Sequence, residues 1–286
     1  MGKITDYPKV TTLKNDNVFL LDGPDGTKLI TTEKMLAYFS NTSGLTTALI
    51  NISNILKPEN HRNIFRGKNL GTVVTDAQKK AIQDGTFDDL FIGDYWTING
   101  TVYRIADMDY FLRCGDTDFT KHHLVLVPDT NMYSAKMNEE NVTTGGYTGS
   151  KMYTENLEQA KTKIATDFGS LVLTHREYLT NAVSNGAPSG GAWFDSTVEL
   201  MNEIMVYGTH VYAAMGTGSS VPNKYTVGKT QMALFRLMPK FISNRQWFWL
   251  RDVVSAPNFA FVGSSGTAAF NGATSSNGVR PEFIIG

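Results

Sequence analysis

Short runs of alternating apolar and polar positions fill the last forty residues. They lie at 247–252, 258–262, 266–270 and 278–285, are rich in aromatic and β-branched side chains, and are separated by Gly, Ser, Asn and Pro. This pattern predicts consecutive antiparallel strands. Because terminal segments are ordered mainly when they are paired, we expect the last strand to lie in one sheet with strands formed near Trp96.

Five further apolar runs predict strands on either side of a helical middle. They lie at 95–98, 102–105, 124–127, 209–212 and 232–235. The first two flank Asn99-Gly100, which is the strongest short-range hairpin signal, and the third stops at a proline. Strands at both ends of the chain must pair across the middle, so the expected fold class is α+β.

Two helices are predicted in that middle from apolar residues that recur every three or four positions. The first covers 153–168, with Thr154 as its N-cap and a glycine after its last residue. The second covers 196–208, where Ser196 and Glu199 have the spacing of a capping box.

The N-terminal part predicts a separate organisation. Residues 1–43 form an anchoring module, a β-hairpin with strands at 18–21 and 28–31 followed by a short helix. Residues 44–84 form a helical stalk and a connecting arm, and residues 85–286 form the main domain. A hairpin with one short helix is too small to be stable alone, so the module is expected to need a partner surface.

The stalk prediction depends on apolar residues at steps of four, three and four, the spacing of a coiled-coil seam. These residues are Leu45, Leu49, Ile52 and Leu56. Two interpretations stay open for this segment: a self-association helix, or an amphipathic helix that covers part of the main domain.

Composition and charge narrow the classes of partner. The 286 residues carry 26 basic and 27 acidic side chains, so no net field favours nucleic acid or an anionic membrane. The start lacks the apolar stretch of a secretory signal, and no run is long enough to span a bilayer. The single cysteine, Cys114, excludes an intramolecular disulfide. We expect a protein made in a reducing cytoplasm, with no nucleic-acid partner and no membrane insertion.

Several segments resemble a family of virion proteins. Trp-Leu-Arg at 249–251, a polar stretch with a mid-strand glycine, and Gly-Val-Arg-Pro at 278–281 before an apolar strand resemble the C-type-lectin-like domain of bacteriophage and prophage virion proteins. Further matches, to a group of tail-fibre, head-fibre and structural proteins, lie at 65–71, 85–96 and 199–208. The resemblance spans 63–286 and implies a mixed antiparallel sheet with two helices for the main domain. It does not name a ligand, because one fold hosts many functions.

The sequence contains few motifs that indicate a catalytic or metal-binding site. His122 and His123 are neighbours near a strand, so they would point to opposite faces, and we expect one to be packed and the other solvated rather than both to hold a metal. No nucleophile elbow is present, and Cys114 is expected to be a small buried hydrophobe. The calcium motifs of C-type lectins are missing. We expect no catalytic residue, no metal and no cofactor.

Two arginines belong to the motifs that carry the resemblance. Arg251 and Arg280 are expected to lie near one another with Asp252 or Glu282 as partners. Such a group serves either as a structural ion pair that holds the terminal strands or as a binding site, and the first is favoured.

The stretch 253–278 is the best candidate for ligand binding, because its Ser, Gly, Ala, Thr, Asn and single Phe residues suit contact with another molecule. The candidate residues are Asn258, Phe259, Phe261, Ser264, Ser265, Thr267, Phe270, Asn271, Thr274 and Asn277. In lectin-like phage proteins the corresponding segment forms the exposed face. The alternative is that these residues form plain β-turns at a sheet edge.

The resemblance implies a virion fibre of the receptor-binding type. Its N-terminal module would attach to other virion proteins, its C-terminal domain would bind a host-surface ligand, expected to be a glycan, and it would form a homotrimer, as fibres commonly do. One alternative is a capsid-decorating head fibre with a mainly structural role. Another is a glycan-active enzyme, which needs paired carboxylates across a cleft. Its candidate carboxylates would be Asp88, Asp89, Asp94, Asp107 and Asp109.

Overall fold

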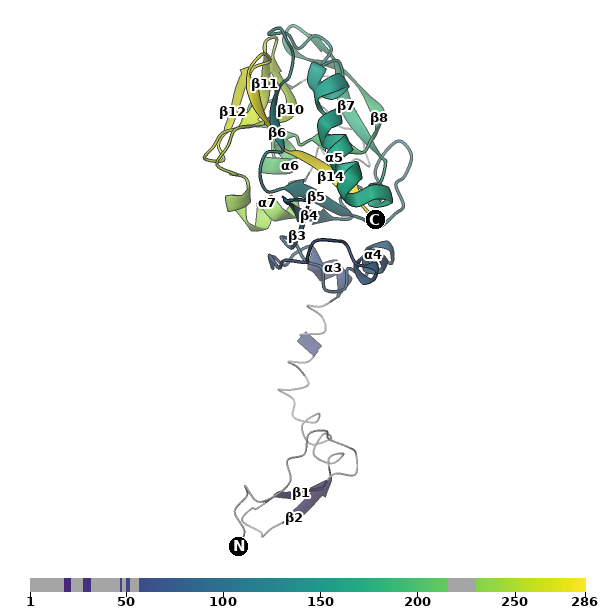
Figure 1. Cartoon of the computed structure of the whole chain (residues 1–286). Coiled ribbons are helices and arrows are strands. Elements are labelled where there is room, and N and C mark those ends of the chain that lie inside the picture. The colour runs from purple at the N-terminus through teal and green to yellow at the C-terminus, as the bar shows by residue number, and fades with distance from the viewer. Residues whose placement is uncertain (1–17, 22–27, 32–46, 48–49, 52–56, 216–229) are drawn as a thin grey trace. The chain divides into compact units, whose positions relative to one another are not determined.

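The computed structural model describes residues 18–21, 28–31, 47, 50–51, 57–215 and 230–286 (Figure 1). The chain divides into two units, Met1–Lys57 and Pro58–Gly286. In the smaller unit, β1 (Val18–Leu21) and β2 (Lys28–Thr31) pair antiparallel, which confirms the predicted hairpin. The coiled-coil candidates Leu45, Leu49, Ile52 and Leu56 lie outside the described residues.

The larger unit is built on a central sheet in the strand order β3-β4-β5-β14-β9. Its strands are β3 (Tyr95–Ile98), β4 (Thr101–Met108), β5 (Leu124–Pro128), β9 (Val198–Leu200) and β14 (Pro281–Ile285). Asn99 and Gly100 both have positive φ, 46° and 79°, and form the tight turn between β3 and β4. The last strand pairs antiparallel with β5 and β9, so the C-terminal segment is held in the same sheet as Trp96, as predicted.

A second five-stranded sheet has the order β12-β11-β10-β13-β6. Its strands are β6 (Tyr133–Lys136), β10 (Phe248–Ser255), β11 (Asn258–Val262), β12 (Ala268–Gly272) and β13 (Ser276–Val279). β10 and β13 run parallel, whereas the other pairs in this sheet are antiparallel. The predicted C-terminal runs are therefore strands, although the chain passes from one sheet to the other between β13 and β14.

Arg280 occupies the point where the chain changes sheets. Its buried guanidinium donates to the carbonyl oxygens of Pro128 at 2.8 Å, Phe241 at 3.0 Å and Ile242 at 3.3 Å. Burial lowers the pKa of Arg280 to about 10. The expected pairing of Arg280 with Asp252 or Glu282 is wrong, because its hydrogen bonds go to the backbone carbonyls at the end of β5 and around Phe241, which the guanidinium satisfies.

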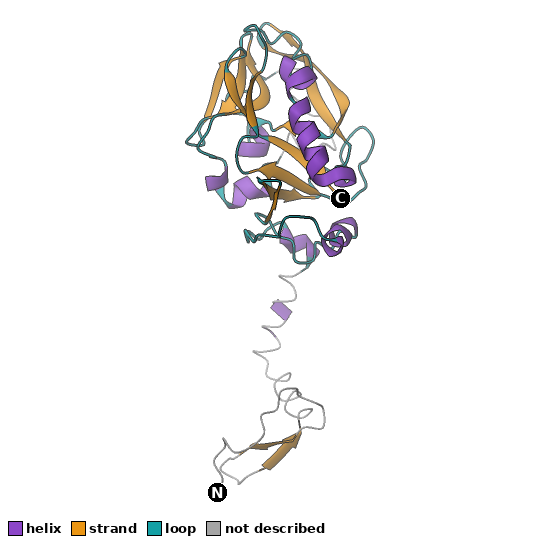
Figure 2. Cartoon of the chain, in the orientation of Figure 1, coloured by secondary structure: helices purple, strands orange, loops and turns teal. Residues whose placement is uncertain are grey.

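The predicted first helix is present, but it begins earlier than expected. A π-helical turn (Met152–Asn156) precedes α5 (Glu158–Phe168), and a 3-10 turn (Gly169–Leu171) follows it. Figure 2 shows α5 as the longest helix beside the strands, and Phe168 contacts Phe283 of β14 with ring centroids 5.1 Å apart. Thr154 is not the N-cap, because winding has already begun at Lys151 and the Thr154 hydroxyl donates to the Ser150 carbonyl.

The predicted second helix is largely wrong. Ser196 ends β8 and Glu199 lies in β9, so their side chains meet in the core, where the Ser196 hydroxyl donates to the Glu199 carboxylate at 2.9 Å. The helix α6 is short (Glu203–Tyr207), and its N-cap is Asn202, whose side chain accepts from the Met205 amide. Tertiary burial of the strand overrides the local capping pattern.

A long hairpin of β7 (His175–Ser184) and β8 (Ala187–Ser196) was not predicted from sequence. Its turn is Asn185-Gly186, both at positive φ, so the same signal that identified β3 and β4 was present here. Two predicted strands are absent from the described residues: 209–212 is a loop, and the apolar run at 232–235 belongs to α7 (Ala233–Leu237), which a 3-10 turn (Pro239–Phe241) follows.

The expected connecting arm is part of the larger unit. α3 (Pro58–His61) and α4 (Asp76–Gln83) flank a segment in which Phe65 and Asn69 form bridges to Ile92 and Tyr95. The larger unit thus begins at Pro58, not at residue 85.

Asp94 joins this arm to the domain. Its buried carboxylate accepts from the Arg66 guanidinium at 2.6 Å, from the Lys68 amide at 2.8 Å and from the Phe91 amide at 2.9 Å. Two of the segments that resemble virion proteins, 65–71 and 85–96, are therefore in direct contact. The whole larger unit is a mixed α+β structure, mostly strands in antiparallel and mixed sheets with few helices.

Candidate functional site

The hairpin of β11 and β12 contains most of the predicted ligand-binding residues, and strand alternation divides them. Ser264, Ser265, Thr267 and Phe270 are exposed, and Asn258, Asn271 and Thr274 are partly exposed. Phe259, Phe261 and Asn277 are buried. The prediction is wrong for these three, because Phe259 and Phe261 share the face of β11 that packs beside Trp249, and Asn277 lies on an inner strand of the sheet.

Phe270 forms an exposed aromatic pair with a residue from outside the predicted stretch. Its ring centroid lies 5.3 Å from that of Tyr212, at an interplanar angle of 66°. Phe270 is 48% exposed and Tyr212 is 45% exposed. Two large aromatic side chains therefore stand together at the surface, in the edge-to-face arrangement that such rings prefer.

The buried side chain of Glu203, in α6, holds the loop that carries Tyr212. The fully buried carboxylate accepts from the amides of Val211 at 2.7 Å, Tyr212 at 3.0 Å and Ala213 at 2.9 Å. A further bond joins the Ala214 amide to the Val253 carbonyl of β10 at 2.8 Å. Charge-assisted hydrogen bonds of this kind fix the backbone, so the exposed aromatic ring stands on a rigid base.

A groove of about 660 Å³ lies next to this loop. Its walls are Thr143 and Thr144, Val183 and the tip of the β7–β8 hairpin (185–187), the β10–β11 turn (254–257) and Ala214. The Thr143 hydroxyl donates to the carbonyls of Ser255 and Ala256, which fixes the turn against the opposite wall. The groove thus offers hydroxyls, an amide and backbone polar groups, and through Ala214 it reaches the loop that carries Tyr212.

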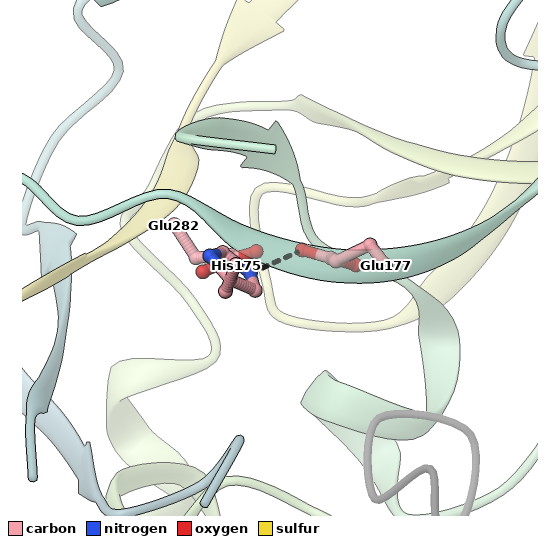
Figure 3. Close-up of side chains that lie close together, drawn as sticks. All are labelled: His175, Glu177 and Glu282. Carbon is pink, nitrogen blue, oxygen red and sulfur yellow. Dashed lines mark hydrogen bonds and ion pairs between the residues drawn. The ribbon is translucent and has the colours of Figure 1, made fainter. Parts of the chain in front are cut away.

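Inside the same unit lies a buried polar cluster. His175 and Glu177 come from β7, and Glu282 comes from β14, with their side chains directed toward one another (Figure 3). Nε2 of His175 lies 3.1 Å from Oε1 of Glu177, and Nη2 of Arg251 lies 2.5 Å from Oε2 of Glu177. The partner of Arg251 in this ion pair is Glu177, not Asp252 or Glu282 as expected.

Burial and charge set the protonation of this buried polar cluster. Burial opposes ionisation of Glu177, but Arg251 and His175 outweigh it and hold the pKa of Glu177 below its ordinary value. Burial, helped by the charge of Glu177, raises the pKa of Glu199 to about 7 and the pKa of Glu282 well above its ordinary value. The Tyr147 hydroxyl donates to Glu199 at 2.8 Å.

Four of the five acidic residues weighed for an enzyme, Asp89, Asp94, Asp107 and Asp109, have structural partners. Asp94 binds the arm, and Asp107 forms an ion pair with Arg62 and accepts from the Ala233 amide at 3.0 Å. Asp89 forms ion pairs with Arg66 and Lys68, so the acidic density of 88–94 serves the junction of the arm with the domain.

The adjacent histidines behave as predicted. His123 is fully buried, and its Nε2 accepts from the Phe111 amide at 3.1 Å, whereas His122 is partly exposed and lies 2.7 Å from Asp109. Cys114 is buried, also as predicted.

Comparison with known proteins adds no relative to this picture: no family model matches the chain, and no curated protein or solved structure does so either. Within the described ranges, no helix has the length and apolar character that crossing a bilayer requires.

Proposed function

We propose that this chain is a virion fibre protein of the receptor-binding type, and that its larger unit binds a glycan on the host surface. The observation that carries the proposal is the exposed pair of Tyr212 and Phe270, in which Tyr212 lies on a loop whose Ala214 also lines the groove at the β10–β11 turn. The sequence resemblance to phage virion proteins supports the same assignment.

The chemistry of this surface suits a sugar. The apolar face of a sugar ring packs on an aromatic side chain, and its hydroxyls need donors and acceptors at short range. Tyr212 and Phe270 provide the aromatic surface. Thr144, Asn185 and the backbone of 254–257 provide the hydrogen-bond donors and acceptors. The buried anchor at Glu203 keeps the loop in place before binding, which lowers the ordering cost of association.

The finer parts of the proposal concern fold and assembly. We assign the C-type-lectin-like fold to the larger unit on the motif resemblance, attachment to the particle to residues 1–43, and self-association as a homotrimer to the segment with Leu45, Leu49, Ile52 and Leu56. Mass in solution of the full chain, and of a chain lacking residues 1–57, tests the assembly. A monomeric mass for both contradicts it.

The proposed role is binding without turnover. Asp94 and Asp107 are buried in ion pairs and amide contacts, so neither is available as an acid or base at a surface cleft. Incubation with surface polysaccharide that leaves the glycan mass unchanged supports this role, and cleavage contradicts it.

A glycan array of bacterial surface polysaccharides tests the binding surface. The full chain with Tyr212→Ala and Phe270→Ala is expected to lose at least tenfold in affinity, because stacking on one aromatic side chain contributes on the order of 1 kcal/mol or more. Trp247→Ala is the matched control, since Trp247 is also exposed but contacts Phe261 on the other face of the hairpin. Equal loss in the control, or no loss in the double variant, would remove the assignment of this surface.

A further inference from the structure

The buried cluster contains three metal-ligand side chains whose donor atoms converge. His175 and Glu177 are two residues apart on β7 and therefore share a face, and Glu282 reaches them from β14 (Figure 3). One donor atom from each lies within 4.8 Å of the others. All three residues are at least 98% buried, so the site is enclosed by the core.

Several of these atoms lack partners. Among the described residues, no donor group lies within hydrogen-bond reach of the Glu282 carboxylate oxygens, and Nδ1 of His175 has no partner. The Glu282 carboxyl group instead lies against the carboxyl group of Glu177, where only a shared proton or a cation can join the two. A buried carboxylate without hydrogen bonds is very costly unless it is neutralised. Glu282 therefore needs either a proton or a cation beside it.

The charges in this region leave a deficit of positive charge. Three buried carboxyl groups, those of Glu177, Glu199 and Glu282, surround the single guanidinium of Arg251. With all three ionised, the carboxyl groups carry two negative charges more than Arg251 balances. One divalent cation balances them.

We propose that His175, Glu177 and Glu282 bind a divalent cation of the zinc class as a structural site. An imidazole nitrogen and carboxylate oxygens are ordinary zinc ligands, and ligand atoms around a tetrahedral zinc ion lie about 3.3 Å apart. Nε2 of His175 and Oε1 of Glu177 are 3.1 Å apart, close to that separation.

Arg251 would not bind the ion itself but would orient Glu177, one of its ligands. It binds Oε2 of Glu177 and leaves Oε1 directed at His175, which is how outer hydrogen bonds orient a metal-binding carboxylate. Because the ligands come from β7 and from the last strand, β14, and are enclosed by the core, the ion would be taken up as the chain folds and would stabilise the folded state.

The test uses the full-length chain and two measurements. Elemental analysis by mass spectrometry after gel filtration is expected to give about one zinc per chain. Treatment with EDTA is expected to lower the midpoint of thermal unfolding by about 5 °C or more, and addition of zinc chloride to restore it.

Two variants complete the test. Glu282→Gln is close to isosteric and is expected to reduce the metal content to background. Glu140→Gln removes an exposed carboxylate outside the cluster and is expected to keep the full content. Wild-type protein without bound metal, whose unfolding midpoint does not respond to EDTA or zinc, would overturn the proposal and leave a proton shared between Glu177 and Glu282 as the neutralising species.

Discussion

Replacement of Glu203 by Gln tests whether the loop with Tyr212 is held from the core. The carboxylate accepts from three backbone amides, those of 211–213, at 2.7 to 3.1 Å, and it is fully buried. A Gln side chain keeps one acceptor oxygen but directs its NH₂ group at the remaining amides. At least one backbone amide of 211–213 then loses its acceptor, and the NH₂ group of the Gln side chain has no acceptor of its own.

The expected cost follows from these contacts. Hydrogen bonds to a charged acceptor contribute about 1.5–3 kcal/mol each, and an unsatisfied buried group costs about 1–3 kcal/mol. Burial and the charge of Glu203 raise the pKa of the neighbouring Asp252 to about 7. Removal of that charge relieves its repulsion with the Asp252 carboxylate, which offsets part of the cost. We expect a net loss of about 2–4 kcal/mol in the free energy of unfolding, which is large beside the ordinary total of about 5–15 kcal/mol.

Urea unfolding of the full chain, followed by tryptophan fluorescence, measures this loss. Glu140→Gln is the control, because Glu140 is exposed and such surface changes stay within about 0.5 kcal/mol. Glycan affinity of Glu203→Gln should fall as well, since the aromatic pair loses its rigid base. An unfolding midpoint equal to that of the control would refute the anchoring role of Glu203.

Two further predictions concern stability. Burial lowers the pKa of His123 to about 4, below the ordinary 6.5, so on acidification the unfolded chain binds a proton before the folded chain does. The free energy of unfolding therefore keeps this contribution above pH 6.5 and falls by about 3 kcal/mol as the pH drops to 4. Unfolding midpoints between pH 4 and 7 should show this slope in wild type and in His122→Gln but not in His123→Gln, and the same slope in all three contradicts the assignment. Asp94→Asn leaves Arg66 without its buried partner and should cost about 3–5 kcal/mol, measured by urea unfolding. Asp84→Asn, which changes an exposed carboxylate at the C-terminal end of α4, is the control. A loss for Asp94→Asn no larger than that of the control would show that the arm is not held through Asp94.

Sequence patterns predicted the elements whose local signal and tertiary role agree. The hairpin at Asn99-Gly100 and the strand at 124–128 form as predicted, because the turn needs positive φ and the strand is buried on both faces. The predicted antiparallel meander of β10 to β12 is also present. The pattern at Ser196 and Glu199 misled because a buried polar pair in a strand has the same spacing as a capping box.

The candidate site could be predicted in part. Phe270 and most of the polar turn at 263–267 lie at the surface, as their composition indicates, since it differs from that of a core strand. Tyr212 was missed because its run at 209–212 has strand-like composition, and only the contact with Glu203 makes it a loop. The cluster of His175, Glu177 and Glu282 joins residues more than a hundred positions apart, so no local spacing could identify it.

Hydrogen–deuterium exchange of the full chain, with and without the best glycan from the array, shows whether the surface of Tyr212 and Phe270 binds that glycan. We expect slower exchange on binding in peptides that contain Tyr212, Phe270 and the 254–257 turn, and unchanged exchange in the arm at 65–71. Protection confined to other segments, or an array on which no glycan binds, would contradict glycan recognition by this surface.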